Sequence, residues 1–135
     1  MMFKKIDHIA IAVNNIEKSA KLFEKILNVA ASKTEIVKSE KVKTKFFHLS
    51  DSKIELIEGT EQNSTVAKFV KKKGEGIHHI AIEVDDIQKE IKRLKKQGFN
   101  TIKNTVSKGA NGKLISFLFP KDTKGVLIEL CQKTN

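Results

Sequence analysis

The chain has 135 residues, 39% of them apolar and 31% charged, which suits one globular domain and excludes a disordered protein. Its net charge of +10 comes from dispersed lysines, with Arg93 as the only arginine and neither tyrosine nor tryptophan, so we expect a solvated lysine surface and no nucleic-acid partner. The absence of a long apolar run or a signal-peptide layout, together with a single cysteine, predicts a cytoplasmic protein with no membrane partner and no disulfide framework.

The first segment of the chain has the pattern of a strand followed by a helix. Apolar side chains alternate at Ile9, Ile11 and Val13, which predicts a strand with one face on a core. The pair Asn14-Asn15 supplies a helix N-cap. The helix that follows has one apolar stripe, at Ile16, Ala20, Phe23 and Leu27. Strand-like segments then lie at about 33–39, 42–49 and 53–58.

A spacer helix and a second copy of the first segment complete the chain. Residues 64–73 predict an amphipathic helix between Ser64 as cap and Gly74 as stop. Residues 77–96 then match residues 6–25 at ten of twenty positions. In this copy Asp85-Asp86 caps the helix and Gly98 closes it. The remaining elements are predicted strands at about 100–105, 113–119 and 125–131, with a glycine-containing loop over 107–113.

The repeat predicts an α+β fold of two pseudo-symmetric βαβββ modules within one domain. The first module covers about 1–60, the spacer helix about 61–75 and the second module about 76–135. No linker rich in proline, glycine or serine separates the halves, so we expect a single domain over 1–135.

The repeat also places His8 and His79 at matching positions of matching strands. Each shares its strand face with small residues, His8 with Ala10 and His79 with Ala81, which is typical of a face that lines a cavity. A single histidine in such a strand is more often a structural residue than a ligand. A binding role is favoured here because a histidine occurs at the same position in both copies of the repeat.

Two glutamates extend this pairing, since Glu55 and Glu129 each lie in the apolar last strand of a module. A lone carboxylate there has a large desolvation cost, unless it points to solvent from an edge strand. Two histidines and two carboxylates suit a divalent Zn, Ni, Co, Fe or Mn ion. The sequence therefore predicts one metal site with His8, Glu55, His79 and Glu129 as ligands.

Three other residues with metal-binding or nucleophilic side chains are not expected to belong to this site. His48 breaks the repeat and is read as peripheral. His78 points away from His79 on the same strand. Cys131 lies on the face of Glu129 but has no histidine partner in the sequence, which favours a buried inert thiol over a nucleophile.

The sequence resembles the vicinal oxygen chelate (glyoxalase/bleomycin-resistance) superfamily. The resemblance rests on DHIAIAV near the start, GEGIHHIAIEVDDI in the middle and GVLIEL near the end. Within the superfamily it is closest to the methylmalonyl-CoA epimerases, over nearly the whole chain. It implies a curved mixed sheet around a metal site with the helices outside, a homodimer, and metal ligands at His8, Glu55, His79 and Glu129.

The resemblance further implies proton transfer at the carbon next to a thioester carbonyl, through a metal-stabilised enolate. Inversion needs two acid/base groups, and Glu129 is the candidate for one of them. Two positions depart from the epimerase pattern. Thr44 lies where one type of epimerase has a glutamate, and Phe119-Pro120-Lys121 replaces a His-Pro-Lys segment.

Two alternative functions remain open. The first is a glyoxalase I-type lactoylglutathione lyase, which would act on a glutathione thioester instead of an acyl-CoA. The second is a non-catalytic protein of the same fold that binds a metal or a ligand. The helix at 64–73 and the segment GEGIHH favour the epimerase, and the positive charge suits an anionic thioester substrate.

Overall fold

The computed structural model describes residues 3–134 of the chain. Within this range the chain forms two compact units. Unit 1 combines residues 3–7 with residues 79–134, and unit 2 is residues 8–78. None of the helices within residues 3–134 has the length and apolar character that a membrane crossing requires.

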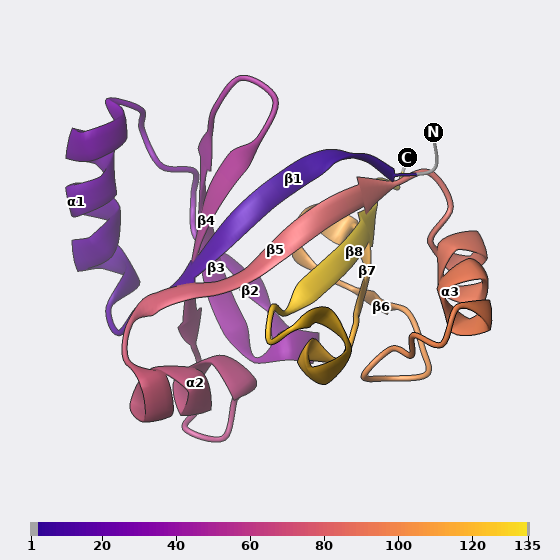
Figure 1. Ribbon diagram of the computed structural model, residues 1–135. Helices are drawn as coiled ribbons and strands as arrows, with labels where there is room; N and C mark the ends of the chain where they lie inside the picture. Colours follow the sequence, from indigo (N-terminus) through magenta and orange to yellow (C-terminus); the bar gives the residue numbers. More distant parts are fainter. Residues whose placement is uncertain (1–2, 135) are drawn as a thin grey trace. The chain divides into compact units, whose positions relative to one another are not determined.

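Unit 2 contains a mixed sheet with the strand order β2-β3-β4-β1 (Figure 1). Its strands are β1 (Phe3–Ala12), whose first residues belong to unit 1, β2 (Glu35–Val37), β3 (Val42–His48) and β4 (Lys53–Gly59). β1 and β4 are parallel, with Ala10 opposite Glu55, and the other pairs are antiparallel. A 3₁₀ turn, Lys38–Glu40, connects β2 to β3.

Unit 1 contains a sheet of the same design, with the order β5-β8-β7-β6. The strands are β5 (Gly76–Val84), whose first residues belong to unit 2, β6 (Ser107–Lys108), β7 (Leu114–Phe117) and β8 (Ile128–Gln132). β5 and β8 are parallel, with Ala81 opposite Glu129, and the other pairs are antiparallel. Two 3₁₀ turns, Ala110–Gly112 and Pro120–Thr123, flank β7.

The predicted helix caps are present in both repeats. Asn15 caps α1 (Ile16–Leu27) by accepting from the N–H of Lys18, and Asp86 caps α3 (Ile87–Lys96) by accepting from the N–H of Lys89. Both satisfy donors that the first turn of a helix leaves free. The elements therefore follow the order β1-α1-β2-β3-β4 and β5-α3-β6-β7-β8, which confirms the α+β class and the two βαβββ repeats.

The spacer helix α2 (Thr65–Lys73) packs on β4 and is bounded as the sequence predicts. Ser64 accepts from the N–H of Ala67, and Gly74 ends the helix at a φ of +86°, where a side chain would be strained. Gly59, at the end of β4, lets α2 approach closely, because a Cβ there would lie 2.2 Å from the Ser64 Oγ.

Each sheet has one face packed on a helix. In unit 2, α1 covers β3 and β4, and in unit 1, α3 covers β7 and β8. The core of unit 2 consists of Val13, Ile16, Ala20, Phe47 and Leu56. The core beneath α3 consists of Val84, Ile87 and Leu130. We call this side of each sheet its helix face and the opposite side its site face.

Three sequence predictions differ from the structure. The strand at 100–105 is wrong, because only Thr101 makes a single bridge there, to Leu118. The short strand β6 instead lies inside the predicted loop over 107–113, where Ser107 and Lys108 pair with β7. The divide between the units also differs from the module boundary, since residues 3–7 belong with the second half of the chain. The single domain stays a prediction.

Candidate functional site

The site face of unit 2 carries a buried histidine–glutamate pair. His8 on β1 and Glu55 on β4 lie with Nε2 and Oε1 3.1 Å apart. Each residue is only 5% exposed. The ring of Phe46 on β3 meets the imidazole of His8 edge-on, with the ring centres 5.8 Å apart. The alanines of β1, Ala10 and Ala12, are fully buried on the same side of the strand.

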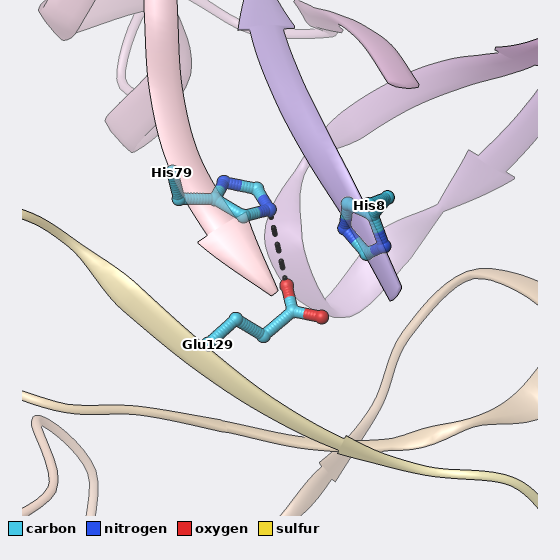
Figure 2. A group of neighbouring side chains, drawn as sticks. All are labelled: His8, His79 and Glu129. Carbon is cyan, nitrogen blue, oxygen red and sulfur yellow. Dashed lines mark ion pairs between the residues drawn. The ribbon is translucent and has the colours of Figure 1, made fainter. Parts of the chain in front are cut away.

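The site face of unit 1 carries an equivalent pair. His79 on β5 and Glu129 on β8 lie with Nε2 and Oε1 3.2 Å apart. Figure 2 shows His79, Glu129 and His8 as sticks, and its dashed line marks the His79–Glu129 contact. Phe117 on β7 meets the imidazole of His79 edge-on at 5.3 Å between ring centres.

Strand register makes the two pairs equivalent residue by residue. Glu55 lies opposite Ala10 on one side and Phe46 on the other, and Glu129 lies in the same way between Ala81 and Phe117. Phe46 and Phe117 are 71 residues apart, whereas Glu55 and Glu129 are 74 apart, so unit 1 has three additional residues between β7 and β8. This insertion lies outside the paired strands. The same histidine, alanine, phenylalanine and glutamate positions recur in both units, as the repeat predicts.

Burial of two carboxylates on these faces needs compensation. A carboxylate removed from water is strongly destabilised unless it is paired or bound to a cation. Here each carboxylate contacts an imidazole nitrogen. His8, His79 and Glu129 are all buried, and each can offer one ligand atom to a metal ion. Imidazole and carboxylate are suitable donors for a divalent first-row transition metal, so the residues present fit such an ion.

Charged residues that the sequence analysis missed lie further along the site face of unit 1. The Lys113 Nζ lies 2.9 and 2.8 Å from the two carboxylate oxygens of Asp7, and this pair is buried. Glu83 is also buried and lies 3.7 Å from Lys4 and 3.5 Å from Lys133. Asp7 and Lys113 are 106 residues apart, so no local sequence pattern could reveal their pairing.

The remaining histidines and the cysteine lie as the sequence predicts. His48 is exposed at the end of β3, and His78 packs edge-on against Phe69 of α2. Cys131 is fully buried. Burial is the main cause that raises the pKa of its thiol, and the negative charge of Glu129 raises it further. The thiol is therefore kept in its unreactive protonated form.

The chain is similar to known proteins over most of its length. A family model described as the Glyoxalase/Bleomycin resistance protein/Dioxygenase superfamily matches residues 7–117. The mitochondrial methylmalonyl-CoA epimerase of Homo sapiens is 39% identical over 129 residues, which cover 95% of this chain and 73% of the human protein.

Solved structures agree with this similarity. The crystal structure of methylmalonyl-CoA epimerase from Mycobacterium tuberculosis has a TM-score of 0.96 at 29% identity, and the match covers 99% of this chain and 91% of that chain. A Streptomyces coelicolor methylmalonyl-CoA epimerase in complex with 2-nitronate-propionyl-CoA has a TM-score of 0.95 at 29% identity and covers 98% of this chain and 99% of that chain. This chain therefore belongs to the Glyoxalase/Bleomycin resistance protein/Dioxygenase superfamily.

Proposed function

We propose that this protein is a metal-dependent epimerase of the methylmalonyl-CoA type, which moves a proton at the carbon next to a thioester carbonyl. The observation that carries the proposal is the repeated pair of buried histidine and glutamate, His8 with Glu55 and His79 with Glu129. The similarity to methylmalonyl-CoA epimerases over nearly the entire chain supports it. It also favours this reaction over that of a lactoylglutathione lyase.

The proposed metal ligands are His8, Glu55, His79 and Glu129. A bound divalent ion supplies Lewis acidity toward the substrate oxygens, which makes the neighbouring C–H bond more acidic. The imidazoles and carboxylates of this chain hold and orient that ion. The edge-on contacts of Phe46 with His8 and of Phe117 with His79 restrict the tilt of both imidazoles.

Glu129 is the proposed acid/base group. Its carboxylate can accept the proton from one face of the substrate carbon, and inversion then needs a second acid/base group that delivers a proton to the opposite face. The side chains Ala81, Ile115 and Cys131 form an apolar cluster beside Glu129, and Phe117 packs against it.

The proposed substrate is an acyl-CoA thioester whose acyl group carries a carboxylate. The relatives named above include one solved with 2-nitronate-propionyl-CoA, which has the same thioester framework. The net charge of +10 favours the approach of such an anion. The homodimer and the cytoplasmic location stay predictions from the sequence.

The test is solvent exchange of the substrate α-proton. The metal-loaded protein is incubated with a single epimer of methylmalonyl-CoA in D₂O, and the α-proton is followed by NMR. Deuterium uptake together with formation of the other epimer is the expected result. The methylglyoxal–glutathione adduct serves as the control substrate, and we expect no turnover of it.

Two outcomes would contradict the proposal. Turnover of the glutathione adduct without exchange on methylmalonyl-CoA would assign the protein to the lyases. Tight binding of methylmalonyl-CoA without exchange would identify a non-catalytic binding protein.

A further inference from the structure

Thr44 is a buried polar residue on the site face of unit 2 that the metal ligand set does not use. It lies on β3, opposite Ile57 of β4, and two residues before Phe46. Glu55 is therefore its diagonal neighbour on the same face, at a Cβ separation of about 7–8 Å or less. Thr44 is 1% exposed, and its Oγ1 has no hydrogen-bond partner among the described residues.

The other polar side chains on the two site faces have charged or imidazole partners. His8 contacts Glu55, His79 contacts Glu129, and Lys113 contacts Asp7. Glu83 lies within 4 Å of two lysines. The Glu83 Oε1 also lacks a hydrogen bond, but it has the ion pair with Lys133. The buried hydroxyl of Thr44 differs because it has neither a hydrogen bond nor an ion pair among the described residues.

The repeat shows that the fold does not need a hydroxyl at this position. In unit 1 the equivalent of Thr44 is Ile115. Each lies opposite the residue two positions after the glutamate of its unit, Ile57 for Thr44 and Cys131 for Ile115. Ile115 is 5% exposed and belongs to an apolar cluster. An aliphatic side chain therefore fills the same position in a strand of the same design.

A buried hydroxyl without a partner lowers stability, because it loses its hydrogen bonds to water and gains none. The aliphatic residue at the equivalent position would avoid that loss. A hydrogen-bond acceptor on the bound substrate would supply the partner that this hydroxyl lacks. The position of Thr44 beside Glu55, a proposed metal ligand, places that partner close to the reacting group.

We propose that Thr44 is a substrate-positioning residue, whose hydroxyl donates a hydrogen bond to an oxygen of the substrate acyl group. This inference rests on the proposed function. A threonine hydroxyl is not ionised near neutral pH, so Thr44 orients the acyl group and does not abstract the proton.

The test compares Thr44→Val with Thr44→Ser. Valine keeps the shape and removes the hydroxyl, whereas serine keeps the hydroxyl. The probe is 2-nitronate-propionyl-CoA, whose nitronate oxygens replace those of the acyl carboxylate, and binding is measured by titration calorimetry. We expect Thr44→Val to bind it about 10- to 100-fold more weakly, as for loss of a hydrogen bond to a charged group. Thr44→Ser should restore most of the affinity.

The matched control is Ser116→Ala. Ser116 is also buried with an unpartnered Oγ, but it lies opposite Leu130 and therefore on the helix face of unit 1. Both Thr44→Val and Ser116→Ala should leave the melting temperature unchanged or raise it, because neither removes a hydrogen bond. Only Thr44→Val should weaken the binding of the probe and raise the KM for methylmalonyl-CoA.

The possible outcomes distinguish failure of the proposed role of Thr44 from failure of the proposed epimerase function. Thr44→Val with the affinity and KM of the wild type, in a protein whose wild type is active, overturns the role of Thr44 alone. A lower melting temperature for Thr44→Val overturns it as well, since the hydroxyl would then have a partner within the fold. A wild type that neither binds the probe nor exchanges the α-proton overturns both proposals.

Discussion

At the scale of single residues, the two glutamates of the site faces are similar in surroundings but differ in their proposed roles. Each is 5% exposed and contacts one imidazole. Glu55 has Lys53 two residues before it on the same strand, with the Lys53 Nζ 5.1 Å from the ring centre of Phe46. Glu129 is followed by the buried thiol of Cys131. The two glutamates therefore differ in the residue two positions away on the same strand face, a lysine for Glu55 and a thiol for Glu129.

Substitution of the glutamates tests these roles. We expect Glu129→Gln to lower α-proton exchange by about 10²- to 10⁴-fold, because the amide cannot accept the proton. Glu55→Gln should lower the metal content, and it should lower exchange by less than Glu129→Gln does, because an amide oxygen can still bind a metal. Metal content is measured by plasma mass spectrometry, and exchange by NMR in D₂O.

Glu83→Gln is the matched control for a buried glutamate outside the proposed ligand set. Glu83 is 4% exposed and lies near Lys4 and Lys133. It should retain the metal content and the exchange rate of the wild type. Loss of metal in Glu83→Gln equal to that in Glu55→Gln would show that the ligand set is assigned wrongly.

At the scale of elements, the two repeats agree at their helix caps and differ in the strands that follow the helix. Asn15 and Asp86 have the same φ of −141° and cap helices that begin with isoleucine. The strands that follow α3 are less regular, since β6 has only two residues and a 3₁₀ turn separates it from β7. The prediction of a strand at 100–105 was wrong and β6 was missed, because short strands depend on their partners more than on their own pattern.

The caps provide a prediction at this scale. Asn15→Ala should lower the free energy of unfolding by about 1 kcal/mol, because the N–H of Lys18 loses its acceptor. Urea denaturation followed by circular dichroism measures the change. Asn14→Ala is the control, since the contact made by Asn14 with Glu75 uses the backbone N–H. Equal destabilisation by both variants would contradict the role of Asn15 as the cap.

At the scale of the whole molecule, the proposed ligand set takes one histidine and one glutamate from each unit. His8 and Glu55 are 47 residues apart in the chain, and His79 and Glu129 are 50 residues apart. A ligand that binds the folded protein more tightly than the unfolded one stabilises the fold. The free energy of folding should therefore be coupled to binding of the metal.

Removal of the metal tests that coupling. At a free-metal concentration of about 100 times the Kd, binding should stabilise the folded protein by roughly 2.7 kcal/mol. Treatment with a chelator should therefore lower the melting temperature measured by calorimetry, and the metal should restore it. His79→Ala should be insensitive to both treatments. A melting temperature that does not respond to chelation in the wild type, at measured full metal loading, would oppose the proposal.

The sequence by itself determined the features that depend on neighbouring residues. Alternation at Ile9, Ile11 and Val13, the caps Asn15 and Asp86, and the match of His8 with His79 are all local patterns, and all predict the observed elements. The repeat also identified Glu55 and Glu129 as a pair, because it compares two segments without needing their contacts. The family likewise follows from the sequence.

The tertiary structure alone decided which distant residues meet. Strand register sets Glu55 beside Ala10, and burial reveals the unpartnered hydroxyl of Thr44 opposite Ile57. Two further features depend on residues far apart in the sequence. These are the pairing of Asp7 with Lys113 and the placement of residues 3–7 with the second half of the chain. A side chain's partners across a sheet are set by the pairing of strands, which no local pattern specifies.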